Sequence, residues 1–445
     1  MKKYNNYKDS GIEWIGKIPE HWDIILFKRI ILKIKDGTHG TFQRVSNGHP
    51  FLSAKNVYDN GIKIGEKESN ISEEDYLEIT KNGFPSKNDL LITCVGTIGR
   101  TYVYDFEKPM AFQRSVTFIR FYDGINPQFY KYYVQSSIYQ NLLISLAKTS
   151  AQSGIYMGDL MNTTTIKIPP FEQTAIANYL DHKTTQIDTL IAKKEQFISL
   201  LQEERTAVIN QAVTKGLDPN VPMKDSGIEW LGEIPEHWEV KKLKLLANIQ
   251  GRIGFKGYTV GDLVSEGEGA LTLGAKHIDK FNQLNLSNPE FISWDKYYES
   301  PEIMVQIGDI ILTQRGTLGK VILIKEDIGK ATINPSMVIL SKLKANDYFL
   351  YYFFNSDYFK SWIDLTNTAT AVPMISQGQL GNLKLVLPNN DEQNQIVNSI
   401  QKSIKKIDDI IVKAQQEIEL LKEYKTALIS EVVTGKVDVR DKVLN

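Results

Sequence analysis

Two short segments combine basic, amide and hydroxyl side chains with glycine, which suits contact with nucleic acid. The segments are KDGTHGTFQR (35–44) and QGRIGFKG (250–257). Their candidate contact residues are Thr38, His39, Gln43, Arg44, Arg252 and Lys256. Arginine and amide side chains can bond base edges bidentately, whereas lysine and hydroxyl groups suit phosphates. Residue types alone leave open whether these segments contact DNA or are simple connecting loops.

Further candidate contacts fall at matching places in the two halves of the chain. They are Lys55, Asn56, Thr97, Arg100, Gln113 and Arg114 in the first half, and Lys276, His277, Arg315, Thr317, Lys320 and Asn334 in the second. Several lie on or beside a Gly-Thr-x-Gly turn, at 96–99 and 316–319. We expect the glycines of these turns to permit positive φ rather than to cradle a phosphate.

Motifs for catalysis are weak or missing in the sequence. An adenine methyltransferase needs an N/D-P-P-Y/F motif, but the nearest string, IPPF (168–171), has Ile168 at the polar position. GTLGK (316–320) is too short for a phosphate-binding P-loop, and six scattered histidines show no metal-ligand spacing. Cys94, the only cysteine, lies in the apolar run LLITCVG and is expected to be a buried thiol. We therefore expect no catalytic residue and no metal site.

The charge balance of the 445 residues argues against a protein that coats nucleic acid through bulk electrostatics. The formal net charge is −1, but residues 1–170 carry 21 Lys and Arg against 17 Asp and Glu, whereas residues 224–388 carry 17 against 19. Any grip on DNA must then be local or shared. A single cysteine and the lack of an apolar leader or membrane-length run are typical of a cytoplasmic protein.

The sequence is an internal repeat of about 220 residues. KDSGIEWIGKIPEHW (8–22) recurs as KDSGIEWLGEIPEHW (224–238), and DLLITCVGTIGR (89–100) as DIILTQRGTLGK (309–320). Because the order of such matches is kept along the whole chain, two copies of one unit related by a pseudo-twofold are expected.

Each copy begins with a region of mixed α/β pattern. Short β-like runs such as DLLITCV and KVILIK are punctuated by glycine and proline, and Tyr- and Phe-rich stretches have helical spacing. We predict an α+β protein with two pseudo-twofold-related globular α/β domains and two long helices. The expected boundaries are 1–170 and 224–388 for the domains, 171–213 and 389–434 for the helices, 214–223 for a linker and 435–445 for a tail.

The two helical regions carry apolar residues at alternating spacings of three and four. The predicted helix-pair interface consists of Leu180, Ile187, Ile191, Ile198, Leu201, Val208, Ile400, Ile404, Ile407, Ile411, Ile418, Leu421 and Leu428. This is the period of a coiled-coil seam, so the helices are expected to pair with each other antiparallel, over roughly 50 Å. The alternative is that each helix packs only on its own domain.

The doubled opening motif and the linker predict how each domain begins and where the two termini lie. Trp14, Pro19 and Trp22, like their counterparts at 230, 235 and 238, are expected to clamp the start of each domain rather than to stack on bases. His21 and His237 are interpreted as structural groups. Since both chain ends resemble parts of the linker VTKGLDPNVPMKDSG (213–227), the termini should lie close together.

The ordered set of motifs resembles the specificity (S) subunits of type I restriction-modification systems. The resemblance rests on the twin GIEW…IPEHW segments, DGTHG (36–40), the Gly-Thr-x-Gly turns, the Glu-Gln helix starts and the two heptad helices. It implies a non-catalytic subunit in which each globular domain, a target recognition domain, reads one half of a bipartite asymmetric site in double-stranded DNA. It also implies two methyltransferase subunits docked on the helices for N6-adenine methylation, and two motor-nuclease subunits that cleave unmethylated DNA.

The resemblance implies no cofactor bound by this chain, since S-adenosylmethionine, ATP and Mg would be used by the partner subunits. Two readers on a rod can lie about one turn of DNA apart, roughly 34 Å, which suits a bipartite site. The alternative is a coiled-coil scaffold that binds proteins and no DNA, which the near-neutral charge favours. A mobility-shift assay with and without the partner subunits distinguishes the two.

Overall fold

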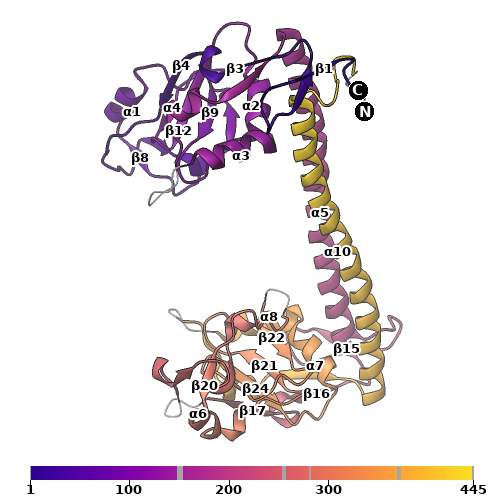
Figure 1. Cartoon of the computed structure of the whole chain (residues 1–445). Helices are drawn as coiled ribbons and strands as arrows, with labels where there is room; N and C mark the ends of the chain where they lie inside the picture. Colours follow the sequence, from indigo (N-terminus) through magenta and orange to yellow (C-terminus); the bar gives the residue numbers. More distant parts are fainter. Residues whose placement is uncertain (1, 148–153, 253–256, 280–281, 368–371, 443–445) are drawn as a thin grey trace. The chain divides into compact units, whose positions relative to one another are not determined.

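The computed structural model describes residues 2–147, 154–252, 257–279, 282–367 and 372–442. It divides into two units, residues 1–195 with 415–445 (unit 1) and residues 196–414 (unit 2). Figure 1 shows that each unit contains an α/β domain and parts of two long helices. The predicted fold class is confirmed, as a duplicated α/β domain with long helices.

Unit 1 is built from short strands followed by helices. Its strands are β1 (Tyr7–Asp9), β2 (Lys17–Pro19), β3 (Asp23–Leu26), β4 (Ile31–Asp36), β5 (His49–Leu52), β6 (Val57–Tyr58), β7 (Gly61–Ile62), β8 (Asn70–Ile71), β9 (Leu90–Thr93), β10 (Thr101–Val103), β11 (Ala111–Phe112), β12 (Val116–Phe121) and β13 (Thr164–Lys167). Its helices are α1 (Glu73–Thr80), α2 (Pro127–Gln135), α3 (Ser137–Leu146), α4 (Met157–Met161) and the first part of α5 (Pro170–Lys215).

Two sheets of unit 1 form the frame of its domain. One has the order β10-β9-β12-β4 with antiparallel neighbours, and the other has the order β11-β5-β8, in which β11 and β5 are parallel. The strands β9 and β12 are almost fully buried, which explains why LLIT and VTFIRF read as apolar runs rather than as alternating ones.

Unit 2 repeats this order of elements. Its strands are β14 (Met223–Asp225), β15 (Glu233–Pro235), β16 (Glu239–Lys242), β17 (Asn248–Gly251), β18 (Leu263–Val264), β19 (Gly269–Leu273), β20 (Phe291–Ser293), β21 (Ile310–Thr313), β22 (Val321–Leu323), β23 (Ala331–Ile333), β24 (Met337–Ser341) and β25 (Lys384–Leu387). Its helices are α6 (Trp294–Tyr298), α7 (Asp347–Phe354), α8 (Asp357–Thr366), α9 (Gln377–Gly381) and the first part of α10 (Asn390–Val433).

The sheets of unit 2 correspond to those of unit 1. The order β17-β24-β21-β22 matches β4-β12-β9-β10 strand for strand, and the second sheet, β18-β20-β19-β23, again contains one parallel pair, β19 with β23. The registers also agree: Lys35 lies opposite Phe118 in unit 1, as Gln250 lies opposite Ile339 in unit 2. Positions in the two units can therefore be compared residue by residue.

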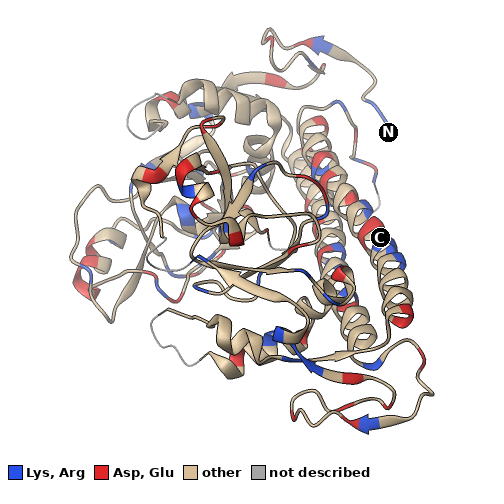
Figure 2. Ribbon diagram, turned by 90° about the horizontal axis from the view of Figure 1, so that it is seen from below, with Lys and Arg blue, Asp and Glu red and all other residues tan. Residues whose placement is uncertain are grey.

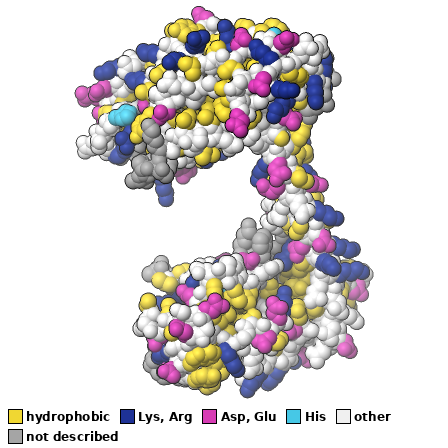
Figure 3. All heavy atoms as spheres, in the orientation of Figure 1, with side chains coloured by type: hydrophobic (Ala, Val, Ile, Leu, Met, Phe, Trp, Pro, Cys, Tyr) yellow, Lys and Arg dark blue, Asp and Glu magenta, His cyan; other side chains and the backbone are white. Residues whose placement is uncertain are grey.

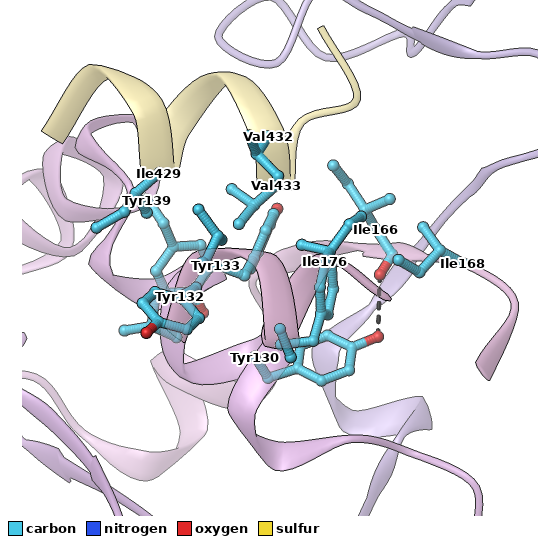
Figure 4. Close-up of a cluster of buried hydrophobic side chains, with 14 of the residues drawn as sticks. Tyr130, Tyr132, Tyr133, Tyr139, Ile166, Ile168, Ile176, Ile429, Val432 and Val433 are labelled. Atoms are coloured by element: carbon cyan, nitrogen blue, oxygen red, sulfur yellow. Dashed lines mark hydrogen bonds between the residues drawn. The ribbon is translucent and has the colours of Figure 1, made fainter. Parts of the chain in front are cut away.

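The aromatic stretches form helices that cover the sheets, as predicted. In unit 1, Asn126 and Ser136 cap α2 and α3 with their side chains, and Pro127 occupies the first turn of α2. Figure 4 shows the tyrosines of α2 and α3 packed among Ile176 of α5 and Val432 and Val433 of α10. The hydroxyl group of Tyr130 donates a 3.0 Å hydrogen bond to the carbonyl oxygen of Ile166 there, so this large polar side chain is satisfied inside the core.

The long helices pair antiparallel within each unit. In unit 1, Lys425 of α10 forms an ion pair of 2.7 Å with Asp188 of α5, and Lys194 pairs with Glu417. In unit 2, Arg205 pairs with Asp408 at 3.4 Å. Since numbers rise along one helix as they fall along the other, the helices run antiparallel, and the alternative that each packs only on its own domain is wrong.

The predicted seam residues form the shielded stripe of the two long helices. All of those named from the heptad pattern are buried or half-buried, whereas Leu190, Leu200, Ile410 and Leu420, which lie off the seam, are more than 40% exposed. Figure 2, a ribbon coloured by residue type, shows that basic and acidic residues alternate along the long helices.

The doubled opening motif is a structural clamp, as predicted. The indole nitrogens of Trp22 and Trp238 each donate a 3.0 Å hydrogen bond to a glutamate at the start of a long helix, Glu172 and Glu392 respectively. Both indole side chains are fully buried, so they cannot stack on bases.

The two ends of the chain lie together in unit 1. The backbone nitrogen of Asp438 donates a 2.9 Å hydrogen bond to the carbonyl oxygen of Lys2, and the Lys2 ammonium group pairs with Asp441. The expected closeness of the termini is confirmed.

Candidate nucleic-acid interface

In unit 1, the strands β4, β5, β9 and β11 end next to one another, and the loops that follow them carry most of the predicted contact residues. The loop after β4 is joined to the loop after β11, because Thr38 donates its backbone N–H to Phe112 and Arg114 donates its own to Thr38. Ser115 then links two further strand ends: its hydroxyl accepts the N–H of Ala54, and its carbonyl oxygen accepts the N–H of Cys94. The loops that carry Thr38, Lys55, Thr97 and Arg114 are therefore neighbours.

Unit 2 gathers the corresponding strand ends in the same way. Asn334 follows β23 and donates its backbone N–H to Leu273 at the end of β19. Ser336, the counterpart of Ser115, accepts backbone hydrogen bonds from Gln314 and Arg315 after β21. The matching places noticed in the sequence are thus one structural site, present once in each unit.

The loop after β4 presents polar side chains to solvent. Thr38 uses its hydroxyl oxygen to accept the N–H of Gly40, which fixes the turn. The His39 side chain is 67% exposed, and Gln43 is also exposed. The Arg44 guanidinium lies 4.5 Å from the ring centre of Phe51, which orients it while leaving it exposed.

Three predicted contact residues are buried, and for these side chains the prediction of direct DNA contact is wrong. Asn56 is 3% exposed; its amide donates to Lys63 and Glu68 and accepts from the N–H of Ser53. His277, at the same place in unit 2, is 1% exposed: Nδ1 accepts from Gly274, and Nε2 lies 3.2 Å from the Asn288 carbonyl oxygen. Both side chains accept the backbone N–H of the N-cap residue of a short 3-10 turn, Ser53 and Gly274 respectively.

Arg252 is the third buried residue, with 5% of its surface exposed. Its Nε donates to the carbonyl oxygen of Ile333 and its Nη2 to the hydroxyl of Thr332. Burial lowers the pKa of this guanidinium, and Tyr258 lies below it at 5.4 Å. Arg252 therefore holds two strands of unit 2 together, while its predicted companion Lys256 lies outside the described residues.

Two further basic residues, Lys320 and Arg100, contact the segments next to these 3-10 turns. The Lys320 ammonium donates to the carbonyl oxygens of Ala275 and Ile278, and the Arg100 guanidinium lies 4.6 Å from the ring centre of Tyr58. Lys55 and Lys276, which lie in the turns themselves, are exposed and pair at 2.8 and 2.7 Å with Glu68 and Glu290 respectively. These lysines can reach DNA only by exchanging a carboxylate for a phosphate.

The remaining candidates form the exposed part of the site. Thr97 and Arg114 in unit 1 and Arg315 and Thr317 in unit 2 are exposed, and Gln113 is half-buried beside Arg114. Asn334 is half-buried, with Oδ1 accepting from both the N–H and the hydroxyl of Ser336. The glycines beside them, 96, 99, 316 and 319, all have positive φ, as predicted.

Sequence reasoning missed the glutamate partners in the clamps and the acidic partners in the helix pair. Glu172 and Glu392 were visible only as part of helix-start motifs. Asp188 and Asp408 are related by the repeat, as are Lys425 and Arg205, so the two ion pairs are pseudo-twofold copies of one interaction. A search for opposite charges at repeat-related helix positions is the signal that finds them.

The faces visible in Figure 3 show no broad basic surface, and the described residues show no metal-ligand group. On the faces visible in Figure 3, basic, acidic and apolar side chains are interspersed without a continuous basic surface. Among the described residues, no group of three His, Cys, Asp or Glu side chains is arranged to hold a metal ion. In the described part of the chain, none of the helices combines the length and apolar character needed to cross a membrane.

The duplicated α/β frame, the gathered strand-end loops and the helix pair are those of a duplicated DNA-recognition protein. A family model described as the type I restriction modification DNA specificity domain matches residues 31–199 and 278–420. Because these matches cover more than half of the chain, the protein belongs to this family, and the resemblance seen in the sequence is confirmed.

Similar proteins agree with this family. The type I restriction enzyme MjaVIII specificity subunit of Methanocaldococcus jannaschii is 26% identical over 455 residues, covering 99% of this chain and 97% of the relative. The EcoKI specificity subunit of Escherichia coli K12 is 22% identical, covering 97% and 92%.

Solved structures share the fold at low identity. The crystal structure of the HsdS subunit from Thermoanaerobacter tengcongensis superposes with a TM-score of 0.52 at 13% identity, covering 94% of this chain and 98% of that one. A chain from work described as the structural basis of complex assembly and conformational transition of the type I R-M system reaches a TM-score of 0.68 at 12% identity, covering 94% and 99%.

Proposed function

We propose that each unit of this specificity subunit reads one half of a bipartite, asymmetric site in double-stranded DNA. The observation that carries the proposal is that one frame presents different side chains at equivalent strand ends. Unit 1 offers Gln113 and Arg114 where unit 2 offers Asn334 and Pro335, and Thr38 follows β4 where the buried Arg252 region follows β17. Two similar frames with different exposed groups suit two different half-sites.

The chain is proposed to carry no catalytic residue of its own and to act in the cytoplasm within a larger complex. Methylation of adenine N6 is assigned to two methyltransferase subunits that use S-adenosylmethionine. Cleavage of unmethylated DNA is assigned to two motor-nuclease subunits that use ATP and Mg. This division agrees with the names of the relatives, which are specificity subunits of restriction enzymes.

Exposed apolar side chains on the helices support the docking of two copies of one partner. Unit 1 exposes Leu190 and Leu420, and unit 2 exposes Ile410 and Leu200. Each residue of unit 1 has its repeat-related counterpart, 220 positions away, in unit 2. A repeated surface of this kind suits two identical subunits, one on each unit.

The experiment that tests the function is a genome-wide map of N6-methyladenine in cells that express the partner subunits, with and without this chain. We expect a bipartite motif whose methylation disappears when the chain is deleted. A map that is unchanged on deletion, with the partner subunits present, would contradict the proposed function.

A further inference from the structure

A pocket of about 410 Å³ opens beside the loop after β4 in unit 1. Its apolar wall includes the rings of Phe84, Phe112 and Phe118, and its polar rim includes Lys35, Lys81 and the loop residue His39. The pocket therefore joins the exposed loop of the candidate interface to a group of lysines that the sequence analysis did not select.

Lys35 in the pocket wall and Lys33 beside the pocket are held on one face of the sheet. Lys33 and Lys35 alternate along β4 and lie opposite Arg120 and Phe118 of β12, so they share a face. The Lys33 ammonium lies 5.2 Å from the ring centre of Phe84. Burial lowers the pKa of Lys35, with smaller contributions from the positive charges of Lys33 and Lys81. The ammonium groups of Lys33 and Lys81 are thus each close enough to repel that of Lys35.

Neighbouring charges leave this repulsion only partly balanced. Arg120 lies over the same Phe84 ring, but its guanidinium is bound bidentately to Asp89 at 2.8 Å. Asp36 in the pocket wall accepts a hydrogen bond from Thr117, and burial raises the pKa of this carboxyl group. Glu78 is the other acidic residue in the wall. Lys35 and Lys81 in the wall and Lys33 beside it therefore outnumber the two carboxyl groups, Asp36 and Glu78, so an anion in the pocket is favoured.

Unit 2 lacks this group of lysines. The registers place Asn248 and Gln250 where unit 1 has Lys33 and Lys35. The repeat offset that sets Asp89 against Asp309 places Pro301 where unit 1 has Lys81. The cation near that place in unit 2 is the buried Arg252, whose surroundings include Glu299 and Glu302. These three lysines account for about half of the difference in charge between residues 1–170 and 224–388.

We propose that Lys33, Lys35 and Lys81 bind backbone phosphates of the duplex beside the half-site read by unit 1, and that unit 2 has no equivalent grip. This inference rests on the proposed function and deepens it. Lysine is suited to this task because it acts as a point charge that neutralises phosphate without reading sequence. Unit 1 then contributes more of the salt-dependent affinity for DNA than unit 2, whereas both units contribute to base discrimination.

The test uses the complex assembled with its partner subunits and a duplex that carries the mapped site. Lys33→Asn and Lys35→Gln introduce the residues of unit 2, and Lys81→Gln completes the triple variant. Each lost phosphate contact lowers the slope of log affinity against log salt by about 0.9. We therefore expect the slope of the triple variant to fall by about 2 to 3, with about 10- to 100-fold weaker binding near 0.15 M salt. The ratio of affinities for the cognate site and a single-base mismatch should not change.

A matched control removes three exposed lysines of unit 1 that do not line the pocket: Lys87, Lys108 and Lys167, each changed to Gln. Its salt slope should equal that of the wild type. As a gain-of-function arm, Asn248→Lys with Gln250→Lys should steepen the slope by about 1 to 2. Thermal unfolding of every variant checks that the folds are intact.

The outcomes separate the two proposals. If the triple variant binds the cognate duplex with the wild-type salt slope, or if it loses base discrimination, the phosphate grip is overturned and the proposed function stands. If the wild-type complex shows no preference for any duplex sequence, the proposed function itself fails.

Discussion

The indole nitrogen of Trp22 donates a hydrogen bond to Oε2 of Glu172 across 150 residues of sequence. His21 contacts the other carboxylate oxygen at 2.6 Å, and the hydroxyl group of Tyr4 donates to Oε2 at 3.1 Å. Arg440 from the other end of the chain lies 3.9 Å from the same carboxylate. One buried side chain therefore joins the start of the domain, the start of α5 and both ends of the chain.

The first prediction concerns this junction. Glu172→Ala should destabilise unit 1 by about 2–4 kcal/mol, because it leaves the buried Trp22 N–H and Tyr4 hydroxyl without an acceptor. Glu392→Ala is the matched control in unit 2: Glu392 contacts only His237 and Trp238 among the bonds described, and its side chain is 22% exposed. Its loss should cost about 1–2 kcal/mol, because water can replace part of the contact.

Hydrogen exchange followed by mass spectrometry measures this difference, since it reports the opening of each unit separately. Faster exchange confined to unit 1 in the Glu172 variant is the expected result. Equal losses in the two variants would mean that the extra contacts of Tyr4 and Arg440 contribute nothing to stability.

A second prediction concerns the ion pairs that repeat along the helix pair. Asp188→Lys places two lysines opposite each other and should cost about 1 kcal/mol, a small effect because the Asp188 side chain is 51% exposed. The double variant Asp188→Lys with Lys425→Asp should regain most of this loss. Denaturant unfolding at low and high salt measures both, and the difference between the variants should shrink in 1 M salt. Failure of the double variant to recover stability would exclude a role for this pair in helix register.

A third prediction comes from a buried aspartate that has different neighbours in the two units. Asp89 binds Arg120, whereas in unit 2 Ser341 stands at the place of that arginine, and burial raises the pKa of the matching Asp309 to about 6. A folded-state pKa above the unfolded value means that the folded state binds the extra proton. Asp309 therefore weakens unit 2 above pH 6, and its effect disappears as the pH falls toward 4.

Asp309→Asn should raise the free energy of unfolding at pH 7 by about 1–2 kcal/mol, because the charge is removed while the acceptor for the Gln306 N–H is kept. The gain should shrink between pH 6 and pH 4. The same substitution at Asp89 should instead destabilise unit 1 by about 3 kcal/mol, since it leaves the Arg120 charge without its partner. The two variants must differ in sign at pH 7; a gain in both would contradict the assignment of Arg120 as the cause.

The strands and helices of the fold could be predicted from the sequence because each has a local pattern of apolar residues. Buried strands such as LLIT, the aromatic helices and the heptad seam each leave a periodic trace, and the repeat doubles every trace. The partner of a polar side chain leaves no such trace. Asn56 reads as an exposed amide until Glu68 and Lys63 are seen to bond it, and Arg252 reads as a surface cation until Thr332 is seen beside it.

The lysine group of unit 1 was missed for a related reason. Lys33 and Lys35 lie in β4 and Lys81 lies 46 positions after Lys35, so only the sheet register and the fold of the intervening chain bring them to the pocket and its edge. Repeat comparison alone, which sets Asn248 and Gln250 against the first two lysines, shows that charge differs between the units. It does not show that the charges converge.

The last prediction concerns base reading by the exposed strand-end residues. Arg114→Ala should alter discrimination only at positions of the half-site read by unit 1, and Arg315→Ala only at positions of the other half, because each arginine belongs to a different unit. A lost base contact should lower affinity for the cognate duplex about 5- to 100-fold and relax preference at one or two base pairs. Binding of the assembled complex to duplex libraries randomised in one half-site at a time measures this.

His277→Gln is the control: its buried side chain should change stability and leave discrimination unchanged. Relaxed preference in both halves from a single arginine substitution would contradict independent reading, because it would mean that the two units sense DNA as one body.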